Sequence, residues 1–238
     1  MRKNGILALF LALGLFSCKE DVPEPAAIKG LEYFPLTIGR FVEYEADSTV
    51  YTEVPKDTLN FKYRIKEKLV EEFIDNQGLK AYRLERYIKW FNPLVPYDSM
   101  NWQIKEAWLV KANNARVQVQ ENNNLYTKLI FPTLENASWD GNAYNSLGKS
   151  TYAYEYIDRA ENINGLSLNR VLKVKQKTDT SNLIINQLEY EQFGADIGLV
   201  FRQYTNIESN NIVPNVPVKN RIEKGVTYTL RIIKYGTE

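Results

Sequence analysis

The sequence predicts an all-β protein: a single domain built as a curved antiparallel sheet or a partly closed barrel, with a β-sandwich as the alternative. Three observations lead to this fold class. From residue 31 onward apolar and polar residues alternate, as they do in half-buried strands. Clusters of turn-forming residues separate the alternating segments at intervals of roughly ten residues. No convincing amphipathic helix follows the N-terminal segment, so the strands connect as antiparallel meanders and not as βαβ units.

The alternation places the strands in order along the chain. In the first clear example Leu59, Phe61, Tyr63 and Ile65 share one side, with polar residues on the other. The next apolar series, in residues 82–90, is interrupted only by Arg86. The same pattern recurs in residues 102–110, 125–131, 168–174 and 226–232. Asn, Asp, Ser and Gly are concentrated between these segments, at 75–78, 113–114, 122–124 and 179–182, which predicts hairpin turns there.

The N-terminus predicts export. Arg2 and Lys3 precede an apolar run at residues 6–16, which is too short to span a bilayer and fits a secretory signal peptide. The run ends in Leu15-Phe16-Ser17-Cys18, which resembles the bacterial lipoprotein box, and Cys18 is the only cysteine in the chain. We therefore expect a lipoprotein signal peptide at 1–17, a lipidated Cys18 with a Pro-containing tether at 18–30, and a β-rich domain at 31–238.

The segment after the cysteine indicates where the protein is anchored. Residues 19–21, Lys-Glu-Asp, resemble the acidic signal that sends lipoproteins of Bacteroidota to the cell surface. A solvated charged tether explains the same residues equally well. We expect attachment to the outer membrane through the acyl chains on Cys18, on the periplasmic side or at the cell surface.

Composition excludes several classes of function. The chain has no histidine, which removes Ser-His-Asp triads, Cys-His pairs and His-ligated zinc. One cysteine allows neither an intrachain disulfide nor a thiolate metal site. Without the signal peptide, 28 basic residues face 29 acidic ones, a balance that argues against nucleic-acid binding.

Three segments resemble a family of Bacteroidota lipoproteins whose activity is unknown. They are YFPLTIGRFVEY at 33–44, FPTL at 131–134 running to WDGNAYN at 139–145, and GADIGLV at 194–200. The resemblance implies a β-rich protein with a curved, partly closed antiparallel sheet, and it brings no catalytic residue. Pro35 and Pro132 suit strand starts or edges, and Gly39, Gly141 and Gly198 suit turns or bulges, so we interpret these segments as architecture.

Carboxylates are the remaining candidates for acid–base chemistry. A glycosidase needs two that face each other, whereas Glu71 and Glu72 are adjacent on a strand and point to opposite faces. Counted from Asp75, an EF-hand would need Gly and Glu where the chain has Lys80 and Arg86, so a hairpin turn is the better interpretation. We expect no catalytic residue, no metal and no cofactor.

A row of lysines is the next candidate for binding. Lys173, Lys175 and Lys177 alternate on one strand face and could meet an anionic ligand, although a solvated face is the favoured interpretation. Across the following turn Glu189 and Glu191 also alternate, which predicts cross-strand ion pairs with the lysines.

The aromatic residues allow two interpretations. Tyr and Phe suit half-buried strand positions, and this structural role is the favoured one. The alternative is a concave face that binds a ligand. Its candidate residues are the four tryptophans of the chain, Trp90, Trp102, Trp108 and Trp139.

The sequence therefore favours a non-enzymatic, lipid-anchored envelope protein with a binding or structural role. The first alternative is a carrier that holds a lipid or other apolar ligand on a concave sheet. The second is a polysaccharide hydrolase that uses paired carboxylates. An apolar ligand, a glycan and an envelope protein all remain candidate partners.

Overall fold

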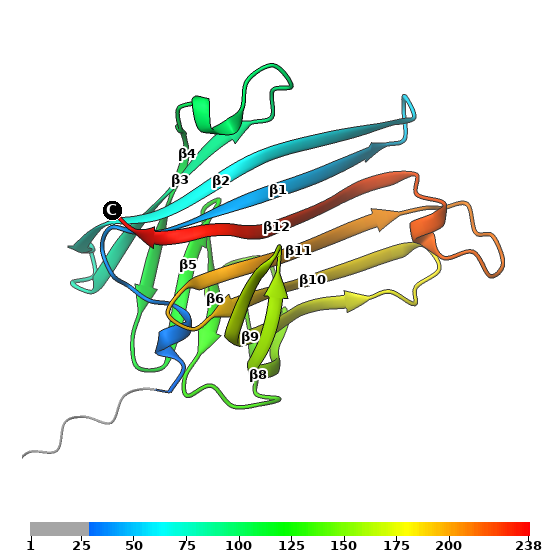
Figure 1. The fold of residues 1–238 in the computed structure, drawn as a ribbon. Helices are drawn as coiled ribbons and strands as arrows, with labels where there is room; N and C mark the ends of the chain where they lie inside the picture. The colour runs from blue at the N-terminus through cyan, green and yellow to red at the C-terminus, as the bar shows by residue number, and fades with distance from the viewer. Residues whose placement is uncertain (1–28) are drawn as a thin grey trace, which may run out of the picture.

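The computed structural model describes residues 29–238, and all twelve strands of this part belong to a single antiparallel sheet (Figure 1). The strand order is β6-β5-β4-β3-β2-β1-β12-β11-β10-β9-β8-β7, and the sheet is nearly closed into a barrel. This confirms the all-β prediction. The β-sandwich alternative is wrong, because β1 pairs with both β2 and β12 and so joins the two halves of the chain into one sheet.

The strands are β1 (Arg40–Thr52), β2 (Asp57–Ile74), β3 (Lys80–Trp90), β4 (Gln103–Ala112), β5 (Arg116–Glu121), β6 (Asn124–Ile130), β7 (Ser138–Asp140), β8 (Thr151–Ile163), β9 (Leu166–Asp179), β10 (Ile185–Gly194), β11 (Gly198–Glu208) and β12 (Lys224–Thr237). Three single 3-10 turns accompany them: η1 (Leu31–Tyr33), η2 (Tyr97–Ser99) and η3 (Val218–Asn220). Within residues 29–238 there is no helix with the length and apolar character needed to cross a membrane. The predicted signal peptide, Cys18 and nearly all of the tether lie outside the described residues.

The turn at Asp75 illustrates how local chemistry sets the hairpins. One Asp75 carboxylate oxygen accepts hydrogen bonds from the backbone N–H groups of Gln77 and Leu79, at 2.8 and 2.9 Å. Gly78 has φ of +75°, a conformation that costs glycine little. The segment is the hairpin turn between β2 and β3, as predicted.

Register shifts bend the sheet. They occur, for example, between Glu43 and Tyr44 in β1 and between Gln192 and Phe193 in β10. An extra residue on one strand increases the local twist and curves the sheet. Because of this curvature one face of the sheet lies inside the barrel; we call it the inner face and the opposite one the outer face.

A seam of main-chain and side-chain hydrogen bonds nearly closes the barrel between β6 and the β7–β8 hairpin. The N–H of Thr127 donates to the carbonyl of Gly141 at 2.9 Å, and the indole N–H of Trp139 donates to the Thr127 carbonyl at 2.8 Å. A side chain at Gly141 would lie 2.4 Å from the ring of Tyr152, so this position requires glycine. The WDGN segment at 139–142 is therefore architectural.

Tyr154 makes two hydrogen bonds across this seam. Its buried hydroxyl donates to the Ile130 carbonyl at 2.6 Å and accepts from the Ile130 N–H at 2.9 Å. We expect Tyr154→Phe to lower the free energy of unfolding by about 1–3 kcal/mol, because both backbone groups lose their partner. Urea unfolding measures this loss. Tyr235→Phe, at a tyrosine that is 46% exposed, is the control and should change little; equal losses would contradict the role of the seam.

One end of the barrel is plugged by the segment that follows Lys29. Tyr33 is buried and donates its hydroxyl to Asp158, and Phe34 packs against Phe193 with ring centroids 6.3 Å apart. The Thr133 N–H donates to the Lys29 carbonyl, which brings the FPTL segment to the same end. The segments that carry the family resemblance thus meet at the plug and the seam.

The other end is open. Figure 1 shows β1, β2, β10, β11 and β12 continuing beyond the barrel as a long curved ribbon, away from the start of the described chain. On the inner face of this ribbon Leu59 and Phe61 are 42% and 40% exposed. The fold therefore has a filled barrel at one end and an uncovered inner face at the other.

Candidate ligand-binding site

Alternation along β2 and β3 sets the chemistry of the inner face. Glu67 pairs across the two strands with Arg86, and Tyr63 pairs with Trp90. Between them lies an apolar pair, Ile65 and Ile88. Along both strands the inner face therefore changes from charged, near the barrel, to aromatic, near the open end.

A buried ion-pair cluster crosses the barrel below the open end. It consists of Glu67, Arg86, Glu121, Lys128, Glu191 and Arg202. The Lys128 ammonium lies 2.6 Å from Glu121 and 2.9 Å from Glu191, and Arg202 contacts the same two carboxylates at 3.1 and 3.4 Å. Arg86 contacts Glu67 at 2.9 Å. Three carboxylates thus face three cations, so the cluster is formally neutral.

The cluster is extended toward the open end by Glu106, which accepts hydrogen bonds from Arg86 and Lys105, both at 2.6 Å. Arg86 also lies over the ring of Trp108, with its guanidinium carbon 4.0 Å from the ring centroid. At the lower side, Gln176 donates to the second oxygen of Glu191 at 2.9 Å. Each carboxylate therefore has a cation and a fixed orientation.

The cations keep Glu106 and Glu121 ionised. Burial alone would raise the pKa of Glu121, but Arg202 and Lys128 lower that pKa to about 2. Burial also opposes ionisation of Glu106, and here Lys105 and Arg86 hold the pKa below its usual value. Glu67 differs, because burial raises its pKa in spite of Arg86.

A hollow of about 290 Å³ opens on the inner face directly above the cluster. Its floor contains Arg86, Glu106, Glu121 and Arg202, and Trp108 forms part of its wall. The tyrosines Tyr63, Tyr204 and Tyr228 and the hydroxyl of Ser48 complete the lining toward the open end. Burial raises the pKa of Tyr63 and of Tyr228, so both phenols stay protonated and can donate hydrogen bonds. We call this space the charged hollow.

A second hollow, of about 440 Å³, lies further along the same face. Ile88 and Trp90 of β3 form its inner side, and Lys89 and Phe91 of the same stretch also reach it. Asn92, Asn101 and Gln103 bring polar amides to it. We call it the tryptophan hollow. The ring of Tyr63, in the charged hollow, lies 5.0 Å from the ring of Trp90, so an aromatic contact links the two hollows.

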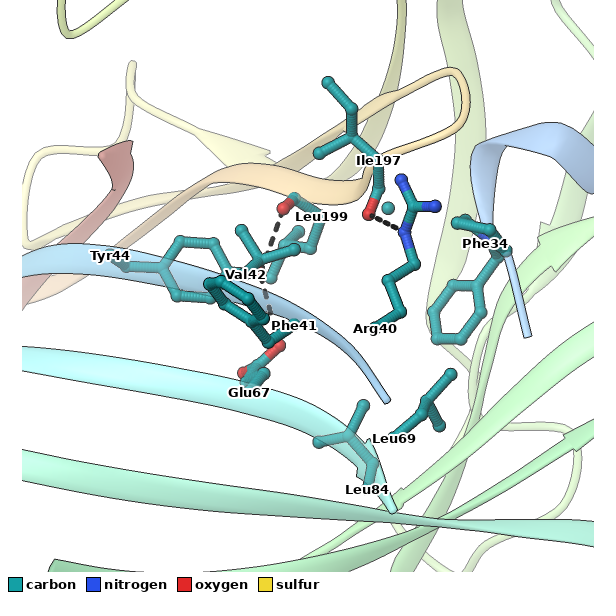
Figure 2. Close-up of a pocket in the computed structure, with 12 residues that line it drawn as sticks. Phe34, Arg40, Phe41, Val42, Tyr44, Glu67, Leu69, Leu84, Ile197 and Leu199 are labelled. Atoms are coloured by element: carbon teal, nitrogen blue, oxygen red, sulfur yellow. Dashed lines mark hydrogen bonds between the residues drawn. The ribbon is translucent and has the colours of Figure 1, made fainter. Parts of the chain in front are cut away.

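A crevice at the plugged end is too small to be a ligand site (Figure 2). It holds about 50 Å³ between Phe34, Val42, Leu69 and neighbouring side chains. Sites for small ligands usually measure about 300–1,000 Å³. Figure 2 shows the Tyr44 hydroxyl directed to the Leu199 carbonyl, at 2.9 Å, across this crevice. The crevice is part of the packing that joins β1 to β11.

The structure does not bring the four tryptophans together on one face. Trp90 and Trp108 line the two hollows of the inner face. Trp102 lies against Lys89, whose ammonium is 4.5 Å from its ring centroid, and alternation places Lys89 on the outer face. Trp139 packs on Tyr154 in the seam, with its indole N–H used by the main chain.

The charged residues singled out in the sequence occupy other places. Glu71 and Glu72 pair separately with Arg83 and Lys80 at the surface. Glu189 lies opposite Lys177, but the salt bridges formed by the described residues do not include the predicted pair between them. The same prediction is wrong for Glu191, because a register shift after Glu189 sets it opposite Val174, on the inner face.

Sequence reasoning missed the ion-pair cluster. Its one visible sign is Arg86, which interrupts an otherwise apolar series on the inner side of β3. Glu67, Glu121 and Glu191 sit on strands whose inner and outer faces both carry charges, so alternation alone does not single them out. Two of the contacts that tie the cluster together, Lys128 with Glu191 and Arg202 with Glu121, join residues 63 and 81 positions apart.

No family model and no curated protein matches the chain. Two solved structures are similar to it. One is described as a predicted lipoprotein of Parabacteroides distasonis, 13% identical, with a TM-score of 0.40 over 86% of this chain and 98% of the other. The second is a predicted exported protein of Bacteroides fragilis with a YmcC-like fold, 9% identical, with a TM-score of 0.42 over 84% of this chain and 98% of the other. Similarities this distant carry no conclusion about the function of this chain.

Proposed function

We propose that this chain is a lipid-anchored protein of the bacterial envelope that binds a ligand on the inner face of its sheet without transforming it. The observation that carries the proposal is the pair of hollows on one uncovered face, above a buried ion-pair cluster. Sites for small ligands are typically concave and combine aromatic walls with a few fixed polar groups. The charged hollow and the tryptophan hollow have both properties.

The predicted lipid anchor is compatible with a binding face that points away from the membrane. Lipidation of Cys18 would attach the chain just before the plugged end, where Lys29 accepts a hydrogen bond from Thr133. The hollows lie toward the other end of the molecule, which Figure 1 shows extending away from the first described residues. A protein anchored in this way presents its binding face away from the membrane.

Binding is favoured over hydrolysis by the state of the carboxylates in the charged hollow. A glycosidase needs one carboxylic acid with a raised pKa, able to protonate the leaving group. Glu106 and Glu121 are the carboxylates that line this hollow, and the pKa of each is lowered by neighbouring cations. Both are therefore ionised bases held in ion pairs.

A substitution that fills the charged hollow tests the proposal. Ser48 lines it from β1, and the next residue, Thr49, lies on the outer face of the same strand. We expect Ser48→Tyr to block ligand binding and Thr49→Tyr to leave it unchanged. The full chain, purified in detergent, is mixed with the aqueous glycan fraction or the organic lipid fraction of bacterial envelopes. Binding is measured as a change in tryptophan emission, which reports on Trp90 and Trp108.

A change that Ser48→Tyr abolishes and Thr49→Tyr retains would support a site in the charged hollow. The proposal would be overturned if neither fraction changed the tryptophan emission, or if both variants still showed the change. Thermal unfolding of both variants establishes that they are folded.

A further inference from the structure

We propose that the ligand is a neutral glycan chain, which lies along the inner face and occupies the tryptophan hollow and the charged hollow together. This inference rests on the proposed function and names the chemical class that the site recognises. It follows from three properties of the two hollows: aromatic ring faces, paired hydrogen-bonding groups, and the absence of net charge in the cluster below them.

The aromatic ring faces suit sugars. Trp90 is 53% exposed although it packs against Tyr63, so a large indole surface stays open beside the tryptophan hollow. Tyr204 and Tyr228 lie opposite each other on β11 and β12 and line the charged hollow. The face of an aromatic ring carries partial negative charge and attracts the weakly positive C–H groups on a sugar ring. These flat aromatic surfaces therefore favour a ligand that presents C–H groups on a flat face, as a sugar ring does.

The polar groups suit hydroxyl-bearing ligands. Amides of Asn92, Asn101 and Gln103 at the tryptophan hollow, and of Asn122 at the charged hollow, each offer a donor and an acceptor. A sugar hydroxyl can both donate and accept, so it matches such groups in either direction. The floor of the charged hollow adds carboxylates and guanidinium groups that are already oriented by their ion pairs.

Charge argues against the other classes of ligand. The lining of the charged hollow alone has one more cation than carboxylates; counted together with the buried groups of the cluster below it, it has four cations and four carboxylates. Lys89, which lines the tryptophan hollow, already donates to the Tyr97 carbonyl at 2.9 Å and lies over the ring of Trp102. An anionic headgroup or nucleotide would need an excess of cations. An acyl chain in the charged hollow would remove water from Arg86, Glu106 and Glu121 without replacing their hydrogen bonds, which is costly.

The arrangement of the hollows favours a chain over a single sugar. The two volumes, about 290 and 440 Å³, are joined where Tyr63 packs on Trp90. Arg86, Ile88 and Trp90 follow one another on the inner face of β3 and run from one hollow into the other. A ligand that fills both has to extend along this strand.

Binding of defined neutral oligosaccharides tests the inference. The full chain is purified in a detergent without a sugar headgroup, and its affinity is measured for gluco-, manno-, xylo- and chito-oligosaccharides of increasing length and for the corresponding monosaccharides. We expect at least one series to bind, with affinity rising with length. Trp90→Ala should weaken binding about tenfold, which is the usual effect of removing a central aromatic contact. Tyr235→Ala removes an aromatic side chain that is 46% exposed and lines neither hollow, so it should leave binding unchanged.

The possible outcomes separate this inference from the proposed function. Binding only to the lipid fraction of the envelope, with no oligosaccharide bound, would overturn the glycan assignment and keep ligand binding. Equal affinity for monosaccharides and long chains would overturn the extended site, as would equal effects of Trp90→Ala and Tyr235→Ala. If no oligosaccharide and no envelope fraction binds, both proposals fail.

Discussion

Replacing Lys128 by methionine is expected to lower the free energy of unfolding by about 3–5 kcal/mol. The side chain of Lys128 is only 5% exposed and holds Glu121 and Glu191 together. Its removal leaves three buried carboxylates against two cations, and water cannot reach Glu191 to compensate. The destabilisation comes mainly from this unbalanced charge, not from a loss of packing volume.

A double variant distinguishes the two causes. Lys128→Met combined with Glu191→Gln restores charge balance, because Glu121 still pairs with Arg202 and Glu67 with Arg86. The double variant should therefore lose less stability than the sum of the two single variants, by about 1–3 kcal/mol. Urea unfolding of the full chain, followed by tryptophan emission, gives the free energies.

The matched control lies on the outer face. Lys173 is 3.1 Å from Glu155, and these side chains are 20% and 45% exposed. A pair of this kind contributes less than about 1 kcal/mol, so Lys173→Met should have a small effect. If Lys128→Met destabilises the protein no more than Lys173→Met, the cluster does not depend on buried charge.

The position of the cluster bears on function as well as on stability. Well-packed apolar residues often replace a buried ion pair with no loss of stability. The plugged end of this barrel has such a filling, with Phe34, Leu69, Leu84 and Phe193. The charged residues instead lie where the filled barrel gives way to the charged hollow, which favours a role as a fixed polar floor for a ligand.

The strands and turns could be predicted because alternation and turn-forming residues act over a few neighbouring positions of the chain. Alternation at Leu59, Phe61, Tyr63 and Ile65 marks the inner face of β2, and the cluster at 75–78 forms its hairpin. Alternation at 59–65 does not itself place the end of β2 at Ile74, because the last residues of the strand gain their partners from β3. The length of a strand depends on its neighbours.

Closure and the site depend on contacts between distant parts of the chain. Lys128 and Glu191 are 63 positions apart, on β6 and β10, which are not neighbours in the sheet, and the curved sheet brings them to 2.9 Å. A single extra residue on β9, Gln176, decides that Glu191 lies opposite Val174 and not opposite Lys175. The loop between β3 and β4 likewise sets Trp102 on the side away from Trp90. Such shifts follow from the whole sheet and not from the spacing of residues.

The second large effect is a loss of stability at alkaline pH. The chain contains 16 tyrosines and no histidine. Histidine is the only side chain that ordinarily titrates between about pH 5 and 8. Burial raises the pKa of Tyr44, Tyr154 and Tyr228, and it raises the pKa of Tyr152 to about 12. We therefore expect a nearly constant free energy of unfolding from about pH 7 to 9, and a steep fall above about pH 10.

The direction of this effect follows from the pKa of the tyrosines in the folded and in the unfolded protein. In the unfolded chain a tyrosine ionises near pH 10, whereas the folded protein keeps these phenols neutral, so each favours the unfolded state progressively as pH rises above 10. For Tyr152 the difference amounts to about 2–3 kcal/mol once the folded pKa is passed. Lys128 acts in the same direction, because nearby carboxylates raise its pKa, and the stability that its charge provides is lost as pH rises above its ordinary pKa.

Absorbance of tyrosinate and circular dichroism, measured together against pH, test this expectation. The exposed tyrosines should ionise near pH 10 without unfolding, and the buried ones only together with the loss of β structure. Tyr152→Phe removes one ionisable group and should move the unfolding midpoint to higher pH, while Tyr235→Phe, at an exposed position, should not. Ionisation of all tyrosines in one step near pH 10, with the sheet intact, would show that these phenols are not buried. The filled barrel, and the floor that it provides for the hollows, would then be wrong.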